Sequence, residues 1–200
     1  MPVIARGLGH RFGDGPLLFR GLDLDLRPDA VYALTGPSGS GKSTLLSILA
    51  GWERPAEGRL ERPGVETIGW VFQNPFGVAR RSALDHVALP LLARGLTQAE
   101  ARDEARERMA RVGLEAVADA PFAQLSGGEA QRLMLARGMA GSPDLLLVDE
   151  PTAQLDPRSS DAVNEALSAL AEAGTIVVVA THDPRTRDAC TAVIDLARAR

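Results

Sequence analysis

Between two apolar stretches, at 31–35 and 43–50, the chain reads Gly36-Pro37-Ser38-Gly39-Ser40-Gly41-Lys42-Ser43. This order fits the phosphate-binding loop pattern G-x-x-x-x-G-K-[ST], which follows a strand and begins a helix. Its glycines let successive backbone N–H groups turn toward phosphate oxygens, and the following helix adds the positive end of its dipole. We expect Lys42 to neutralise charge on the β- and γ-phosphates and the Ser43 hydroxyl to ligate Mg²⁺. The stretch, together with the next residue Thr44, therefore predicts a nucleoside triphosphate site.

A second chemical signal is the acidic pair Asp149-Glu150, which follows the apolar run 145–148. A continuous apolar run of this length is typical of a strand buried on both faces. In α/β folds, ligands bind at the carboxyl ends of such strands. Asp149 is expected to hold Mg²⁺ through water, whereas Glu150, on the opposite side of the strand, is placed to accept a proton from an attacking water.

The order of apolar and amphipathic segments predicts the fold class. Strand-length runs at 31–35, 67–72, 145–148 and 175–181 alternate with helical stretches at 43–50 and 157–173. This alternation predicts an α/β fold with a mostly parallel sheet. The first 30 residues, with leucines at 22, 24 and 26, are typical of half-buried antiparallel strands.

The middle of the chain, residues 74–138, shows no convincing strand but three helices, two of them at about 97–112 and 128–140. Thr97 and Glu100 form a capping box at the start of the first of these two. We therefore expect one domain of 200 residues. Residues 1–73 and 139–200 would form an α/β core with an antiparallel β subdomain, and residues 74–138 an inserted helical subdomain.

Composition narrows the cellular setting. A formal net charge of −4 gives no general attraction to nucleic acid, so no nucleic-acid partner is expected. The sequence has no apolar run of about 18 residues, the length that spans a bilayer. The first eight residues include Arg6 and lack an apolar signal-peptide stretch, and Cys190 is the single cysteine. These features predict a cytoplasmic protein, and any membrane part would belong to another chain.

A third motif indicates the family. The segment Leu125-Ser126-Gly127-Gly128-Glu129-Ala130-Gln131-Arg132 resembles the LSGG signature of ABC-type ATPases. The other elements of that family appear in order. They are an adenine-stacking aromatic at Phe12, a Q-loop glutamine at Gln73, a D-loop at Ala153-Gln154-Leu155-Asp156 and a switch histidine at His182. The resemblance extends from about Leu8 to Leu196, and on it the chain is identified as a member of the ABC family.

The resemblance implies a phosphate-loop (RecA-like) fold that hydrolyses ATP with Mg²⁺. In this family Ser126, Gly127, Gly128 and Glu129 face the γ-phosphate of ATP bound to a second ATPase subunit, so that two chains enclose two nucleotides. Gln73 would sense the metal and the attacking water, and His182 would hold the γ-phosphate, the water and Glu150 in line. The expected catalytic residues are thus Glu150, His182, Gln73 and Lys42. The expected metal-binding residues are Ser43, Gln73 and Asp149. The expected functional residue of the D-loop is Asp156.

Transport is the interpretation that the resemblance favours. A single compact ATPase unit is typical of transporter motors, which work with a separate membrane permease and lie on the inner face of the membrane. In such proteins the segment equivalent to 74–78 receives a short permease helix, so an exposed Phe76 would be a docking contact. The stretch 149–156 is most similar to ATPases of the lipoprotein-releasing and macrolide-export type. Two alternatives remain open: a soluble ABC ATPase with a non-membrane partner, and a non-hydrolysing, ATP-gated module.

Several positions depart from the usual family pattern. Glu129 replaces a glutamine, and Phe12 replaces the more frequent tyrosine. Gly138 lies within a predicted helix where alanine is usual, at a cost of about 1 kcal/mol in helix propensity. His10 and His86 belong to no motif, and we interpret them as structural.

Overall fold

The computed structural model describes residues 1–153 and 155–199. At its centre lies a five-stranded parallel sheet in the order β5-β6-β7-β3-β8. The strands are β3 (Val31–Thr35), β5 (Ile68–Val71), β6 (Leu145–Asp149), β7 (Ile176–Ala180) and β8 (Ala192–Asp195). The predicted parallel α/β sheet is confirmed, and β7, the middle strand, is buried along its whole length.

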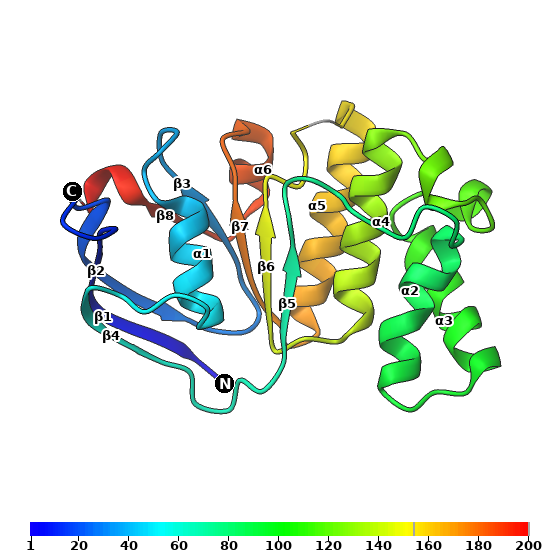
Figure 1. Ribbon diagram of the computed structural model, residues 1–200, viewed down its shortest axis with the longest axis horizontal. Coiled ribbons are helices and arrows are strands. Elements are labelled where there is room, and N and C mark those ends of the chain that lie inside the picture. The colour runs from blue at the N-terminus through cyan, green and yellow to red at the C-terminus, as the bar shows by residue number, and fades with distance from the viewer. Residues whose placement is uncertain (154, 200) are drawn as a thin grey trace.

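A second, antiparallel sheet stands at one end of the molecule (Figure 1). Its order is β2 (Phe19–Leu26), β1 (Val3–His10) and β4 (Glu57–Glu61). The antiparallel strands expected in the first 30 residues are therefore confirmed. The third strand, β4, was not predicted, because its sequence EGRLE is polar and it becomes a strand only by pairing with β1.

Six α-helices connect the strands in the described residues. They are α1 (Lys42–Ala50), α2 (Ala83–Ala93), α3 (Gln98–Ala110), α4 (Gly127–Ala140), α5 (Pro157–Glu172) and α6 (Pro184–Ala189). Short 3₁₀ turns occupy Glu115–Val117, Phe122–Gln124 and Leu196–Arg198. The capping box at Thr97 is present, and Asp156 caps α5. None of these helices is long and apolar enough to cross a membrane.

The helices α2, α3 and α4 lie together at the end of the molecule opposite the antiparallel sheet (Figure 1). All three fall in the segment 74–140, but α4 continues two residues past the expected boundary at 138. The division into a core and an inserted helical subdomain stays a prediction.

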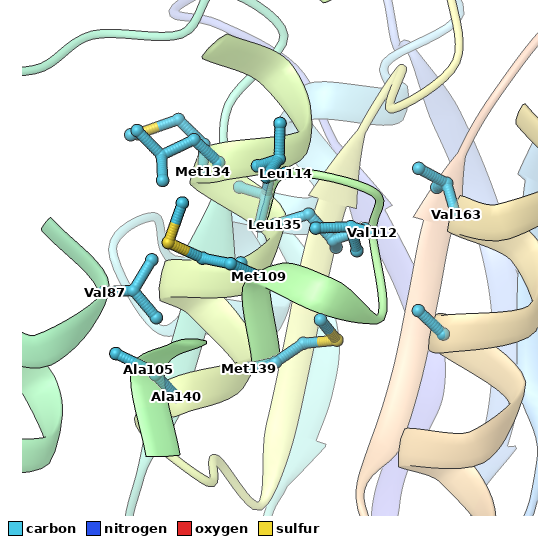
Figure 2. Packing of buried hydrophobic residues seen from close by; sticks show 14 of the residues in the cluster. Val87, Ala105, Met109, Val112, Leu114, Met134, Leu135, Met139, Ala140 and Val163 are labelled. Carbon is cyan, nitrogen blue, oxygen red and sulfur yellow. The ribbon is translucent and has the colours of Figure 1, made fainter. Parts of the chain in front are cut away.

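Two buried clusters cover the two faces of the parallel sheet. On β6, Leu146 and Val148 join the cluster shared with α2 to α5, whereas Leu145 and Leu147 join the cluster shared with α1 and the antiparallel sheet. Figure 2 shows the first cluster, in which Met109 and other side chains from α2, α3 and α4 meet. A strand buried on both faces in this way explains why its sequence is an uninterrupted apolar run.

Gly138 allows α4 to approach β5 closely. A Cβ atom at this position would lie 2.9 Å from Cγ2 of Val71 and 3.4 Å from Cδ1 of Leu146. Both neighbours are almost fully buried, and Val71 is β-branched, so neither moves aside easily. The glycine, which the sequence marks only as a helix penalty, is thus a packing requirement of the interface between α4 and the sheet.

We predict that Gly138→Ala lowers the free energy of unfolding by about 1 kcal/mol, because overpacking costs about 1–3 kcal/mol and outweighs the roughly 1 kcal/mol gained in helix propensity. Gly141→Ala is the matched control, since its Cβ would make only an ordinary contact at 3.6 Å. Chemical denaturation of both variants measures the difference. A Gly138→Ala protein more stable than the wild type would contradict the packing explanation.

Candidate nucleotide-binding site

A cleft of about 730 Å³ opens at the carboxyl end of the parallel sheet, around the loop between β3 and α1. Most of the residues predicted to bind the nucleotide line it. They are Phe12, Gly36, Pro37, Ser38, Gly39, Gly41, Lys42, Ser43 and Thr44, joined by Gln73, Asp149, Glu150 and His182. Five segments that are far apart in the sequence thus meet in one cleft.

The loop presents its cation toward the start of α1. Gly41, the residue before the helix, has φ 95°, a left-handed conformation that favours glycine. The Lys42 ammonium folds back over the loop and donates to the carbonyl oxygens of Gly36 (2.9 Å) and Pro37 (3.4 Å). These contacts hold a positive charge inside the curve of the loop, where phosphate oxygens would be bound.

Ser43 and Asp149, the two expected metal residues, already touch. The Ser43 hydroxyl donates to Oδ2 of Asp149 over 2.7 Å. Burial raises the pKa of Asp149, and the neighbouring Glu150 carboxylate adds to the increase, while the hydrogen bond from Ser43 and the charge of Lys42 oppose it. Two hard oxygen donors at this spacing, beside the phosphate loop, match the ligand preference of Mg²⁺.

Glu150 is held in a defined orientation by the residue expected to be the switch histidine. The Glu150 side chain is almost fully buried. One carboxylate oxygen lies 2.8 Å from the ring Nδ1 of His182, and the other accepts from the His182 backbone N–H (3.3 Å). Glu150 also has φ 50°, in the left-handed region, which is costly for a residue with a side chain. Such strain at a functional position is typical of active sites.

Two expected nucleotide-binding residues behave differently from each other. Phe12 is 61% exposed at the mouth of the cleft, so its ring is open to a ligand. Ser40, by contrast, is 1% exposed and does not line the cleft. Its side chain lies under the loop, and a Cβ at Gly36 would come within 2.6 Å of its Oγ. Only the backbone N–H of Ser40, and not its hydroxyl, is therefore placed to donate to a phosphate.

The signature residues lie outside this cleft. Ser126 caps α4, and Glu129 completes a capping box: its Oε2 accepts from the Ser126 N–H (2.8 Å) and hydroxyl (2.7 Å). The hydroxyl and backbone of Ser126 lower the pKa of Glu129. Asp156 caps α5, and its pKa is lowered by Ser159, whose hydroxyl also accepts from Arg132 of the signature segment. Gln154 of the predicted D-loop lies outside the described residues.

His86, interpreted as structural, is a buried and satisfied histidine. Its Nδ1 contacts the Ser82 carbonyl oxygen (2.7 Å), and its Nε2 accepts from the Val78 N–H (2.9 Å). It thereby ties the segment after Gln73 to the start of α2.

A second hollow, of about 370 Å³, lies between β5, α2 and α4. Its wall includes three rings, Trp70, Phe72 and Phe76, of an aromatic row that no sequence pattern predicted. We call this row the aromatic strip: Trp52, Trp70, Phe72 and Phe76, with successive ring centroids 4.5, 5.3 and 5.7 Å apart. Trp52 is 64% exposed and Phe76 58% exposed. Trp52 and Trp70 are 18 positions apart, so no local pattern announces their stack.

The loop, acidic pair and sheet define a phosphate-loop ATPase. The family model described as "ABC transporter" matches residues 19–153. A lipoprotein-releasing system ATP-binding protein of Caulobacter vibrioides is 42% identical, over 91% of this chain and 89% of the relative. An uncharacterized ABC transporter ATP-binding protein of Escherichia coli is 38% identical, over 86% and 83%. A macrolide export ATP-binding/permease protein of Rhodopseudomonas palustris is 35% identical, but this chain covers only 32% of its length.

A solved structure supports the same family assignment. The dimeric post-hydrolysis state of the ATP-binding cassette MJ0796, bound to ADP and Pi, superposes with a TM-score of 0.85 at 29% identity, covering 96% of this chain and 93% of that one. The chain therefore belongs to the ABC transporter family, as an ATP-binding and ATP-hydrolysing subunit of the type found in lipoprotein-releasing and macrolide-export systems.

The backbone strain at Glu150 can be measured directly. We predict that Glu150→Gly is more stable than Glu150→Ala by about 1 kcal/mol, because both lose the contacts to His182 but only glycine relaxes at positive φ. At Glu165, exposed within α5, the same pair should show the reverse order, with alanine better by about 1 kcal/mol. Equal stability of the two Glu150 variants in thermal denaturation would mean that the position is not strained.

Proposed function

We propose that Glu150 is the general base of ATP hydrolysis in this chain and that His182 orients it. The supporting observation is the pair of contacts from His182 to the two carboxylate oxygens, which fix the carboxylate at the edge of the cleft. General-base catalysis requires such a carboxylate within reach of the attacking water. Lys42 neutralises phosphate charge, and Gln73, from the end of β5, lines the same cleft and positions water and metal.

Mg²⁺ is the metal that fits this site. Ser43 and Asp149 would hold it, with Gln73 beside them, and bound there it would neutralise charge shared between phosphate oxygens. The fit rests on the oxygen donors and on the 2.7 Å contact between the first two residues.

A second ATPase subunit completes the site. Ser126 caps α4, and the glycines after it begin the helix, so the N–H groups of these glycines form an anion site that lies outside the chain's own cleft. We propose that this site binds the γ-phosphate of ATP held by a second copy or a close relative. The dimeric structure of the MJ0796 cassette supports the arrangement.

The mechanism predicts the behaviour of Glu150→Gln, which removes the base but keeps its shape. The variant should bind MgATP, hydrolyse it at least about 100-fold more slowly than the wild type, and accumulate as an ATP-bound dimer. Phosphate release and size-exclusion mass, each with MgATP, give the two readouts. Glu165→Gln, the same change outside the cleft, should leave both unchanged. Hydrolysis by Glu150→Gln at the wild-type rate would exclude Glu150 as the base.

We propose that the second hollow, between β5, α2 and α4, binds the membrane permease. Phe76, at the segment where docking is expected, is exposed and continues a strip of aromatic rings, the kind of residues enriched in protein interfaces. Arg137 is the one charged residue among the described residues that line the hollow, and no ion pair is found for it there. We propose that a short apolar permease segment with a carboxylate docks in this hollow and holds the chain at the inner face of the membrane.

Transport remains favoured over a soluble, non-membrane role because the named relatives are subunits or parts of transport systems. The intact pair of Glu150 and His182 speaks against a non-hydrolysing module.

Cell fractionation tests the docking surface. In the source cells, tagged wild-type chain should sediment with membranes, and Phe76→Asp should lower the membrane-bound fraction about tenfold, because a charge replaces a central aromatic anchor. Val193→Asp, equally exposed on β8, is the matched control and should remain at the membrane. Thermal unfolding checks that both variants are folded. Unchanged membrane association of folded Phe76→Asp would exclude this hollow as the docking site.

A further inference from the structure

His10, at the end of β1, is buried in an unusual way. Its side chain is 3% exposed, yet neither ring nitrogen has a hydrogen-bond partner in the part of the chain that the structure describes. A buried polar group without a partner costs stability, and a leucine or phenylalanine would fill the same space without that cost. The position therefore calls for an explanation other than core filling.

The contact that distinguishes His10 is with Phe12. The two ring centroids lie 4.9 Å apart, and the ring planes meet at 82°, an edge-to-face arrangement. This geometry is the favoured one for two aromatic rings, since the positive edge of one meets the negative face of the other. Phe12 is 61% exposed, and His10 is the one aromatic ring among the described residues that packs against it.

His10 is also joined to the phosphate-binding loop. It pairs across the antiparallel sheet with Phe19, and its carbonyl oxygen accepts from the Leu18 N–H over 2.9 Å. These same two residues lie directly against the loop, because a Cβ at Gly41 would be 3.1 Å from the Phe19 ring and 3.2 Å from the Cβ of Leu18. Leu18 and Phe19 therefore contact both His10, which packs against the Phe12 ring, and the phosphate-binding loop.

We propose that His10 is a positioning residue for nucleotide binding: it holds the Phe12 ring at the orientation in which it stacks on the base of ATP. The distance between the base and the phosphates is fixed by the structure of ATP. The Phe12 ring therefore adds most to the affinity for ATP when its position relative to the phosphate-binding loop is already set before binding. The inference rests on the proposed role of Phe12 in base stacking. It assigns a role in binding to a residue that belongs to no family motif.

Two substitutions separate this role from simple packing. His10→Leu removes the aromatic edge, and we expect it to raise the Kd for MgATP by about 2- to 12-fold, the range of an edge-to-face contact. His10→Phe keeps an aromatic edge at the same place and should restore wild-type affinity. The kcat of hydrolysis should not change in either variant, because the contact lies on the base side of the ligand.

Inorganic tripolyphosphate, which has no base, provides the internal control. Its Kd in the presence of Mg²⁺, measured by calorimetry, should be the same for wild type and His10→Leu, whereas a general structural defect would weaken both ligands. In a Phe12→Ala background, His10→Leu should have no further effect on the affinity for MgATP, because the partner ring is gone.

The outcomes are distinguishable. If Phe12→Ala weakens MgATP binding but His10→Leu does not, the inference about His10 is overturned and base stacking stands. If Phe12→Ala itself has no effect, the proposed role of Phe12 is wrong, and the inference falls with it. If His10→Leu and His10→Phe weaken MgATP binding equally, the aromatic edge is not what His10 contributes. If tripolyphosphate binding falls with His10→Leu, the effect is structural.

Discussion

The electrostatic demand of a triphosphate is the constraint on which the rest of this structure depends. Phosphate oxygens need N–H donors and a cation close together, and the loop from Gly36 to Ser43 meets this need only because β3 and α1 hold its two ends. The ammonium of Lys42 already lies against the loop carbonyls, so the cation is placed before a ligand arrives. The fully buried strand β7 beside β3 provides the rigid floor. The packing of the buried sheet therefore determines the position of the phosphate-binding loop at its carboxyl edge.

The elements that the sequence predicts are those with a local physical signal. Continuous apolar runs predicted β3, β6 and β7, and the capping box at Thr97 predicted the start of α3 to within a residue. The elements that no sequence pattern predicts are those that form through distant partners. The polar segment of β4 becomes a strand by pairing with β1, and the stack of Trp52 on Trp70 joins the end of α1 to β5. Gly138 illustrates the difference most clearly, because the helix penalty visible in the sequence is offset by a close approach visible only in three dimensions.

The cleft and the second hollow meet at the end of β5. Phe72 lines the hollow, and the next residue, Gln73, lines the cleft. A segment that docks against the aromatic strip therefore acts one residue away from a group that we place at the metal and the attacking water. A second connection runs from α4, where Arg132 connects the signature helix to the cap of α5 through Ser159. The first connection is a single peptide bond, and the second consists of two hydrogen bonds. Both are therefore contiguous, as are the networks through which energetic coupling between sites is carried.

The central claim is that each ATP is bound by two chains, and the structure of the Glu150→Gln variant with MgATP tests it most directly. The account predicts two chains in which every γ-phosphate contacts Lys42 of one copy and the N–H groups after Ser126 of the other. A structure in which the γ-phosphate is contacted by its own chain alone, with the signature segments turned away, would contradict the account.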